Sequence, residues 1–194
     1  MIKYDFGYEI KPGTTHQWAF DIIKPNSFVL EVGPAFGILT KNLVDKLHCT
    51  VDIVEKDSES GTVSSKFARK ALIGPQGDIE NENCLGLLGS EQYDYIVILD
   101  VIEHLLSPEK VLGKIGRFLK PNGEILLSTP NISHNSVIIN LMNNKFQYTS
   151  LGILDSTHTH FYTKESLQNL IQSCGYTMYR LDKIRKLVGE NEIP

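Results

Sequence analysis

Four short segments of the chain are almost continuously apolar and rich in β-branched residues. They cover residues 28–32, 51–55, 93–100 and 124–129. Such runs are typical of strands that are buried on both faces, because a strand with one solvated face alternates between apolar and polar residues. Strands of this kind need helices on both sides of the sheet.

Segments with the helical spacing of apolar residues lie between and after these strands. We expect helices over residues 38–47, 64–72, 107–119 and 163–175. The third has Ser107 as its N-cap and Pro108 at its first helical position, and the last begins at Thr163 and ends at Gly175. The alternation predicts an α/β fold with a doubly wound, mostly parallel sheet, in which ligands bind beyond the carboxyl ends of the strands.

Composition and charge narrow the classes of function. A chain of 194 residues with 41% hydrophobic residues fits one domain with one core. A net charge of −4 lacks the basic footprint of nucleic-acid binding, and no apolar run is long enough to cross a membrane. Cys49, Cys84 and Cys174 form no CxxC pair and are expected to be core thiols. We therefore expect a cytoplasmic protein that acts on a small molecule, without nucleic-acid or membrane partners.

The loop after the first strand carries the first chemical signal. The stretch VLEVGPAFG places Glu31 inside an apolar strand and then two glycines, Gly33 and Gly37, four residues apart. The dinucleotide fingerprint G-x-G-x-x-G is not matched, because Ala35 and Ile38 stand where its second and third glycines belong. The spacing is instead Glu-x-Gly-x-Ala-x-Gly.

This spacing resembles the E/D-x-G-x-G-x-G motif of the class I S-adenosylmethionine-dependent methyltransferases. Glu55, at the end of the second strand, matches the acidic residue of that strand in the family, and GDIE (77–80) is similar to its third segment. Residues 93–131 are similar to its fourth and fifth strands, so that the resemblance covers about residues 28–180. The wording GILDSTHTHFYTKESL resembles bacterial members that act on sugars or other small polar metabolites and are sometimes joined to glycosyltransferases.

The resemblance implies S-adenosylmethionine as the cofactor and assigns its contacts. Glu31 would help to hold the methionine ammonium, and Glu55 would accept both ribose hydroxyls. Asp78 would approach the adenine amino group, with Ile79 stacked nearby. The start of the helix 38–47 would offer N–H groups to the methionine carboxylate. The expected cofactor-binding residues are Glu31, Gly33, Pro34, Ala35, Gly37, Glu55, Lys56, Asp78, Ile79, Asp100 and Val101.

Ala35 departs from the motif, because it replaces the middle glycine. One methyl group is tolerable if the φ angle there is negative, so we expect weakened rather than lost cofactor binding. The alternative is that EVGPAFG is only a strand-to-helix turn in which Glu31 is a solvated cap.

Three histidines are candidates for contact with a methyl acceptor. The stretch DVIEHL places His104 one turn beyond Asp100, and the resemblance implies that Glu103 or His104 assists in hydroxyl methylation; otherwise His104 caps or packs the strand-to-helix junction. His158 and His160 are two residues apart and point the same way if the segment is extended. They could bind a metal, but no carboxylate pair stands beside them, so we favour acceptor contact, base catalysis or structural hydrogen bonding and expect no metal.

The single domain, residues 1–194, divides into four parts. We expect an N-terminal cap (1–27), a cofactor-binding core (28–131), an acceptor-side lid (132–162) and a C-terminal helix and strand (163–194). The lid is expected because long connections of this kind often cover binding sites.

The expected activity is methyl transfer to a small-molecule acceptor, at an oxygen of a sugar or another polar metabolite. A non-catalytic nucleotide-binding domain of the same fold is one alternative. A nicotinamide-dependent reductase is another, disfavoured by Ile38 and by the lack of a Tyr-x-x-x-Lys pair. Residues 176–187 predict one more strand, with only VGENEIP after it. The sheet should then lack the final antiparallel strand of the family, and its open edge favours association into a homo-oligomer.

Overall fold

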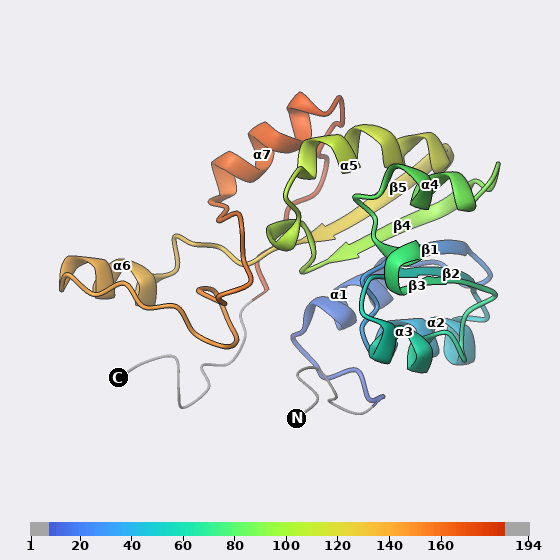
Figure 1. Cartoon of the computed structure of the whole chain (residues 1–194), viewed down its shortest axis with the longest axis horizontal. Coiled ribbons are helices and arrows are strands. Elements are labelled where there is room, and N and C mark those ends of the chain that lie inside the picture. The colour runs from blue at the N-terminus through green and yellow to red at the C-terminus, as the bar shows by residue number, and fades with distance from the viewer. Residues whose placement is uncertain (1–7, 185–194) are drawn as a thin grey trace.

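A five-stranded parallel sheet forms the centre of the computed structural model, which describes residues 8–184 (Figure 1). Its strands are β1 (Phe28–Val32), β2 (Thr50–Glu55), β3 (Lys70–Ile73), β4 (Tyr93–Leu99) and β5 (Leu119–Ser128). They lie in the order β3-β2-β1-β4-β5, and every neighbouring pair is parallel. The doubly wound α/β fold is confirmed, and the order of strands reverses between β1 and β4.

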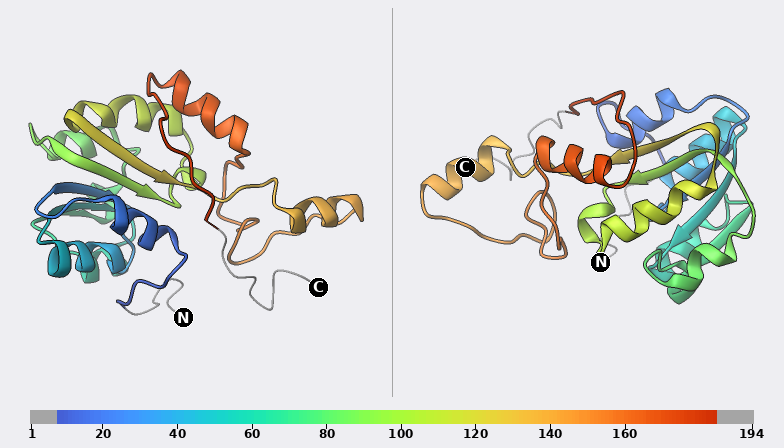
Figure 2. Two further views of the ribbon diagram at one scale, coloured as in Figure 1. Left: turned by 180° about the vertical axis from the view of Figure 1, so that it is seen from behind. Right: turned by 90° about the horizontal axis from the view of Figure 1, so that it is seen from above.

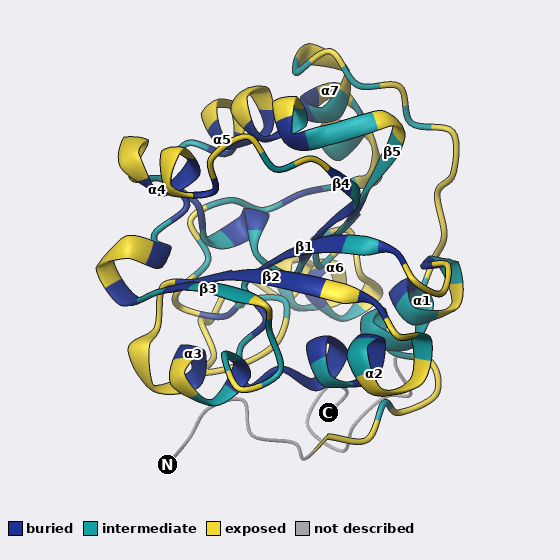
Figure 3. Cartoon of the chain, turned by 90° about the vertical axis from the view of Figure 1, so that its right-hand side faces the viewer, coloured by how far each residue is buried: buried dark blue, intermediate teal, exposed yellow. Residues whose placement is uncertain are grey.

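Helices cover both faces of this sheet. The helices within residues 8–184 are α1 (Thr15–Ile22), α2 (Ile38–Leu47), α3 (Ser58–Ser64), α4 (Glu82–Leu87), α5 (Pro108–Ile115), α6 (Asn135–Met142) and α7 (Lys164–Ser173), with 3-10 turns η1 (Gly74–Gly77), η2 (Ile102–His104) and η3 (Gly116–Phe118). Helices α1, α2 and α3 lie on one face, and α4, α5 and α7 lie on the other (Figures 1 and 3). None of the helices within residues 8–184 is long and apolar enough to cross a membrane.

The core has two halves because successive residues of a strand point to opposite faces. Leu30 and Ile96 belong to the cluster beneath α4, α5 and α7, whereas Val29 and Val97 belong to the cluster beneath α1 and α2. All four side chains are fully buried. The continuous apolar runs of the sequence are therefore the consequence of a sheet that is covered on both sides.

The predicted helix over residues 64–72 is wrong. Helix α3 ends at Ser64, and the chain then continues into β3, which pairs with β2. The helix begins earlier than expected because the Asp57 carboxylate accepts a hydrogen bond from the Ser60 N–H and caps it. Strand β3 is a four-residue edge strand, so it lacks the long apolar run that marked the central strands.

The start of α5 also differs in detail from the expectation. Ser107 occupies the N-cap position and Pro108 follows it, but the Ser107 side chain makes no capping hydrogen bond. The Glu80 carboxylate holds the residues just before the helix, since it accepts the N–H groups of Leu106 and Ser107 at 3.1 and 2.8 Å. A tertiary contact from a distant segment therefore fixes the start of α5, and the local side-chain cap is absent.

The strand predicted over residues 176–187 is wrong for residues 176–184, which form no strand, while 185–187 lie outside the described residues. Side chains hold this segment instead. The Tyr176 hydroxyl donates to the Leu112 carbonyl, and the Trp18 indole N–H donates to Asp182. Within residues 8–184 the sheet ends at β5 and has no antiparallel strand, as expected. Association through that edge stays a prediction, which sedimentation of the protein tests.

The long connection before α7 contains a helix, α6. The helix stands away from the body of the molecule in both views of Figure 2. Val137 is its buried residue, whereas Ile138, Ile139, Leu141 and Met142 are exposed. Helix α6 thus projects from the part expected to be a lid, whereas residues such as His158 in that part line the cavity, and its role as a lid stays a prediction.

Candidate active site

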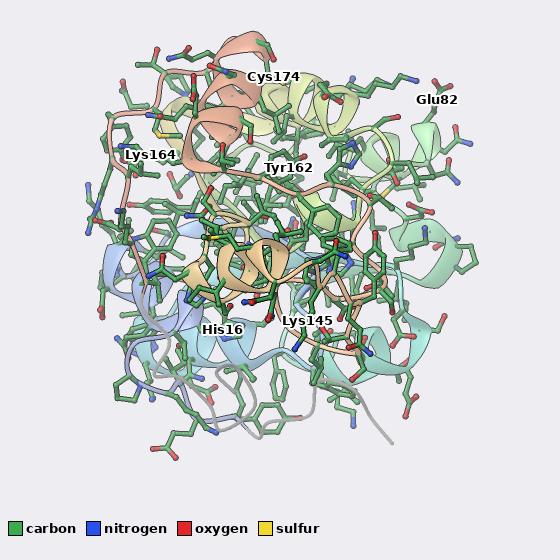
Figure 4. All side chains as sticks on the ribbon, turned by 90° about the vertical axis from the view of Figure 1, so that its left-hand side faces the viewer. His16, Glu82, Lys145, Tyr162, Lys164 and Cys174 are labelled. Atoms are coloured by element: carbon green, nitrogen blue, oxygen red, sulfur yellow. The ribbon has the colours of Figure 1, made fainter. Side chains whose placement is uncertain are left out.

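One cavity lies at the carboxyl ends of the strands, where the order of the sheet reverses. The loop after β1, the end of β2, the turn after η1 and the segment after β4 line it. Figure 4 views the molecule from the side of α6 and labels three further lining residues, His16 of α1, Tyr162 before α7 and Lys164 at the start of α7. A doubly wound sheet binds its ligands at this place.

The glycine loop depends on both of its glycines. Gly33 and Gly37 have φ angles of +70° and +80°, a region that other residues rarely adopt. A Cβ atom at Gly33 would lie 2.5 Å from the Val101 side chain, and one at Gly37 would lie 2.9 Å from Ser64. The tight turn of the loop therefore tolerates no side chain at either position.

Ala35, between these glycines, lacks the negative φ angle under which its methyl group would be tolerable. Its φ angle is +49°, in the left-handed region, rather than negative. This conformation costs a residue with a Cβ about 1–2 kcal/mol. The Ala35 N–H donates to the Glu55 carboxylate at 3.0 Å, and this bond helps to hold the loop in place.

Glu55 links the loop to the end of β2. Its Oε2 accepts the Ala35 N–H, and its Oε1 accepts the Asp57 N–H at 2.8 Å. The residue is 8% exposed and lines the cavity. Burial raises the pKa of its carboxyl group, and the backbone N–H donors oppose that shift. Each carboxylate oxygen keeps a further lone pair, so both can accept a hydroxyl from a ligand.

Glu31 lies beneath the loop rather than in the cavity. It is 4% exposed, and its Oε2 accepts a hydrogen bond of 2.6 Å from the Thr40 hydroxyl on α2. Burial raises its pKa to about 7, the Thr40 bond opposes this shift, and the negative charge of Glu55 adds to it. The alternative of a solvated cap is therefore wrong, because this carboxylate is buried between β1 and α2.

The residues expected near an adenine ring come together at the next part of the wall. The Lys56 ammonium and the Asp78 carboxylate form an ion pair of 2.8 Å. Both residues and Ile79, which is 7% exposed, line the cavity. They present a charged pair and an apolar surface side by side.

The cavity is also lined by the other expected cofactor residues, Pro34, Asp100 and Val101. Asp100 has a φ angle of +53°, and its Oδ1 accepts a hydrogen bond of 2.7 Å from the Ser128 hydroxyl. The Val101 side chain packs over Gly33. Of the expected set, Glu31 and Gly37 are not among the residues that line the cavity.

Only two of the three candidate histidines lie in the cavity. His104 and His158 line the cavity, and their ring centroids are 4.7 Å apart. His160 is not among the lining residues, and its Nδ1 lies 2.9 Å from the Leu105 carbonyl. The expectation that His158 and His160 point the same way is wrong, because the chain bends at Thr159 rather than running extended.

Sequence reasoning missed how Glu103 completes this part of the site. Glu103 is 1% exposed, and ligand atoms of Glu103, His104 and His158 all lie within 4.8 Å of one another. The acidic residue near His158 in the sequence is Asp155, three positions before it, and nothing in that segment points to Glu103. The carboxylate comes from η2, after β4, and only the folded chain brings it there.

Comparison with known proteins gives the family. The sequence matches a family model described as "Methyltransferase domain" over residues 7–181. A ubiquinone biosynthesis O-methyltransferase from Dinoroseobacter shibae is 25% identical over 166 residues, which are 82% of this chain and 65% of that protein. The mitochondrial one from Dictyostelium discoideum is 23% identical over 75% of this chain and 48% of its own length. The chain thus spans about half to two thirds of these relatives.

Solved structures agree with the fold. A SAM-dependent methyltransferase from Aquifex aeolicus superposes with a TM-score of 0.61 at 15% identity, covering 90% of this chain and 88% of that one. Another SAM-dependent methyltransferase, from Thermotoga maritima, superposes with a TM-score of 0.59 at 16% identity, covering 84% of this chain and 70% of that one.

The residues of the cavity fit the cofactor of such enzymes. A buried carboxylate at Glu55 suits a ribose diol, the apolar side of Ile79 suits an adenine ring, and the N-terminus of α2 follows the loop. The family match, the strand order and this donor set agree. The chain therefore belongs to the methyltransferase-domain family, the class I enzymes that use S-adenosylmethionine.

Proposed function

We propose that this chain transfers a methyl group from S-adenosylmethionine to an oxygen of a small-molecule acceptor. The observation that carries the proposal is that Glu55, Asp78 and His104 line one and the same cavity. The curated relatives are named O-methyltransferases, which supports oxygen as the acceptor atom. The resemblance to enzymes that act on sugars supports a polar acceptor.

The cysteines bear on the compartment in which the protein works. Cys49 and Cys84 are unpaired and buried, which supports a reducing compartment such as the cytoplasm.

The chain's main contribution is alignment. S-adenosylmethionine supplies a methyl group whose bond to sulfur breaks as the bond to the acceptor oxygen forms, leaving S-adenosylhomocysteine. Glu55 would hold the ribose hydroxyls, and the wall of Lys56, Asp78 and Ile79 would hold the adenine. Holding donor and acceptor in line replaces a bimolecular encounter, which accounts for much of the acceleration that such a site can give.

The acceptor hydroxyl must lose its proton, and His104 stands where it can assist. The Thr157 carbonyl lies 3.3 Å from the His104 Nδ1. A carbonyl oxygen can only accept, so Nδ1 carries the ring hydrogen and Nε2 carries the lone pair. A lone pair at Nε2 can take a proton from an acceptor in the cavity, a role that contributes typically 10²–10⁴-fold in rate.

Calorimetric titration with S-adenosylmethionine, S-adenosylhomocysteine and NAD tests the binding half of the proposal. We expect saturable binding of both methionine nucleotides and none of NAD. Tight binding of NAD alone would support the reductase instead.

A screen of hydroxylated small molecules, with products identified by mass spectrometry, tests the transfer half. Binding of the nucleotides without turnover of any acceptor would support the non-catalytic alternative. For an acceptor that is turned over, His104→Gln should lower kcat and leave the Kd for S-adenosylhomocysteine unchanged. His48→Asn is the matched control, because His48 is an exposed histidine at the end of α2, outside the cavity.

A further inference from the structure

Two segments that are distant in sequence bring one carboxylate and two imidazoles together in the cavity. Glu103 and His104 lie on η2, and His158 lies in the segment before α7. Their ligand atoms lie within 4.8 Å of one another. Glu103 is almost fully buried, and both histidines are half-buried. The cluster is therefore a shielded group of donors rather than a patch of surface charge.

Hydrogen bonds orient both imidazole rings toward the cluster. The Thr157 hydroxyl donates to Asp155 at 2.8 Å, so its oxygen, like the Thr157 carbonyl, accepts from the His104 Nδ1–H. The His158 Nδ1–H donates to the Ile153 carbonyl at 3.0 Å. Both rings thus carry their lone pair at Nε2. Histidines that bind metals have this arrangement, because a hydrogen bond at one nitrogen sets the other as the ligand.

The backbone that carries these side chains is also fixed. The Glu103 carbonyl accepts the N–H groups of Thr159 and His160 at 2.8 and 3.1 Å, which ties η2 to the segment of His158. The Asp155 carboxylate, 2% exposed, accepts the Thr157 N–H at 2.9 Å. Hydrogen bonds therefore fix the backbone that carries the three donor residues.

We propose that Glu103, His104 and His158 bind a divalent transition-metal ion, with Zn²⁺ as the best match. Two imidazoles and one carboxylate form a donor set that zinc uses at catalytic sites, with a fourth position left for a water or substrate. Bonds of about 2.0–2.1 Å to a tetrahedral ion place the ligands about 3.3 Å apart. In the structure the ligand atoms lie within 4.8 Å of one another. Because the backbone of both segments is already in place, small side-chain rotations are sufficient to bring them to the shorter separation.

The ion's use in catalysis rests on the proposed function, whereas its binding does not. The cluster lines the cavity, so an acceptor hydroxyl can occupy the fourth position. A hydroxyl bound to the ion is more acidic and loses its proton to water at neutral pH, as metal-bound water does. His104 is then a ligand and does not take the proton itself. Oxygens on adjacent carbons suit such an ion as acceptors, because zinc can expand from four to five ligands and then bind both.

Equilibrium dialysis of the full chain against Zn²⁺ alone, without S-adenosylmethionine, tests the proposal. Metal content is measured by mass spectrometry, together with the thermal unfolding midpoint. We expect one tightly bound ion per chain, a raised midpoint, and at least tenfold weaker binding in His158→Gln and in Glu103→Gln. This loss is a lower bound, because even an outer partner of a ligand typically contributes 10–100-fold. Mg²⁺, which prefers oxygen ligands, should bind more weakly than Zn²⁺.

Two controls separate this site from other zinc ligands. His48→Asn removes an exposed histidine and should leave binding unchanged. With Co²⁺ as a spectroscopic substitute, the absorption should lack a thiolate charge-transfer band, which excludes the cysteines. Absence of saturable binding, or equal binding by wild type and both cluster variants, would overturn the proposal. If Glu103→Gln does not fold, the half-buried His158→Gln decides the result. A protein that binds Zn²⁺ but no methionine nucleotide would contradict the proposed function and leave the metal site supported.

Discussion

The ribose contact assigned to Glu55 can be separated from the adenine contact assigned to Asp78 by a matched pair of substitutions. Glu55→Gln and Asp78→Asn each remove a charge and keep the shape of the side chain. Both oxygens of Glu55 accept backbone N–H groups, and the residue lines the cavity. An amide keeps one such oxygen and sets an NH₂ group against the second donor.

The expected losses follow from the burial of the two carboxylates. Charge-assisted bonds are worth about 1.5–3 kcal/mol each, and Glu55, 8% exposed, is little screened. Losing one of them and weakening the other costs about 2–4 kcal/mol, or about 30-fold to several hundredfold in Kd. The Asp78 side chain is 27% exposed and already paired with Lys56. One bond to adenine from such a group is worth about 0.5–1 kcal/mol, or about two- to fivefold.

Calorimetry with S-adenosylhomocysteine measures both losses, and urea unfolding without ligand shows whether the loop has been disturbed. Glu82→Gln, at the exposed start of α4, is the control and should bind as wild type does. A 2′,3′-dideoxy analogue isolates the ribose contact, because the penalty of Glu55→Gln should largely disappear with it. Equal or reversed losses in the two variants, or an undiminished penalty with the analogue, would refute the assignment.

Three further predictions concern the loop and its supports. The pKa of Glu31, raised from 4.5 to about 7, means that the folded state holds the proton more tightly, so the free energy of unfolding should fall by about 3 kcal/mol as pH rises through that interval. Glu31→Gln should abolish this slope in urea unfolding between about pH 5 and pH 8, and a slope that persists would assign it to other groups. Ala35→Gly relieves a φ angle of +49° and should stabilise the protein by up to about 1 kcal/mol, with cofactor binding equal or tighter; destabilisation would show that the angle carries no strain. Gly77→Ala places a Cβ 2.2 Å from the Glu55 carbonyl oxygen and should cost at least about 2 kcal/mol in chemical denaturation, whereas Gly113→Ala, which meets open space on α5, should be neutral or stabilising.

Local pattern was sufficient for the central strands and for the glycine loop. Strands β1, β2 and β4 are buried on both faces, so burial leaves its mark on consecutive residues. The loop requires left-handed backbone at Gly33 and Gly37, and a glycine is the residue that adopts it without strain. Helix α2 was predicted with its observed bounds, Ile38–Leu47, for the same reason: its limits are set by residues next to it.

Where a distant segment supplies the hydrogen-bond partner, the sequence pattern predicted the wrong element or gave no signal. Residues 64–72 have helical spacing, yet pairing with β2 makes β3 a strand, because an edge strand gains its hydrogen bonds from its neighbour rather than from itself. Glu80 holds the residues just before α5 from another segment, and no local sequence signal indicates this contact.

The same division holds within the site. The sequence by itself determined the fold class, and nine of the eleven residues that it assigned to cofactor binding line the cavity, because they follow the ends of strands that local pattern identifies. Only the tertiary structure decided that Glu31 faces Thr40, that His160 turns away, and that Glu103 joins His104 and His158. The physical reason is that side-chain direction and burial depend on which segments meet in space, and a bend at one residue, such as Thr159, redirects the side chains that follow it.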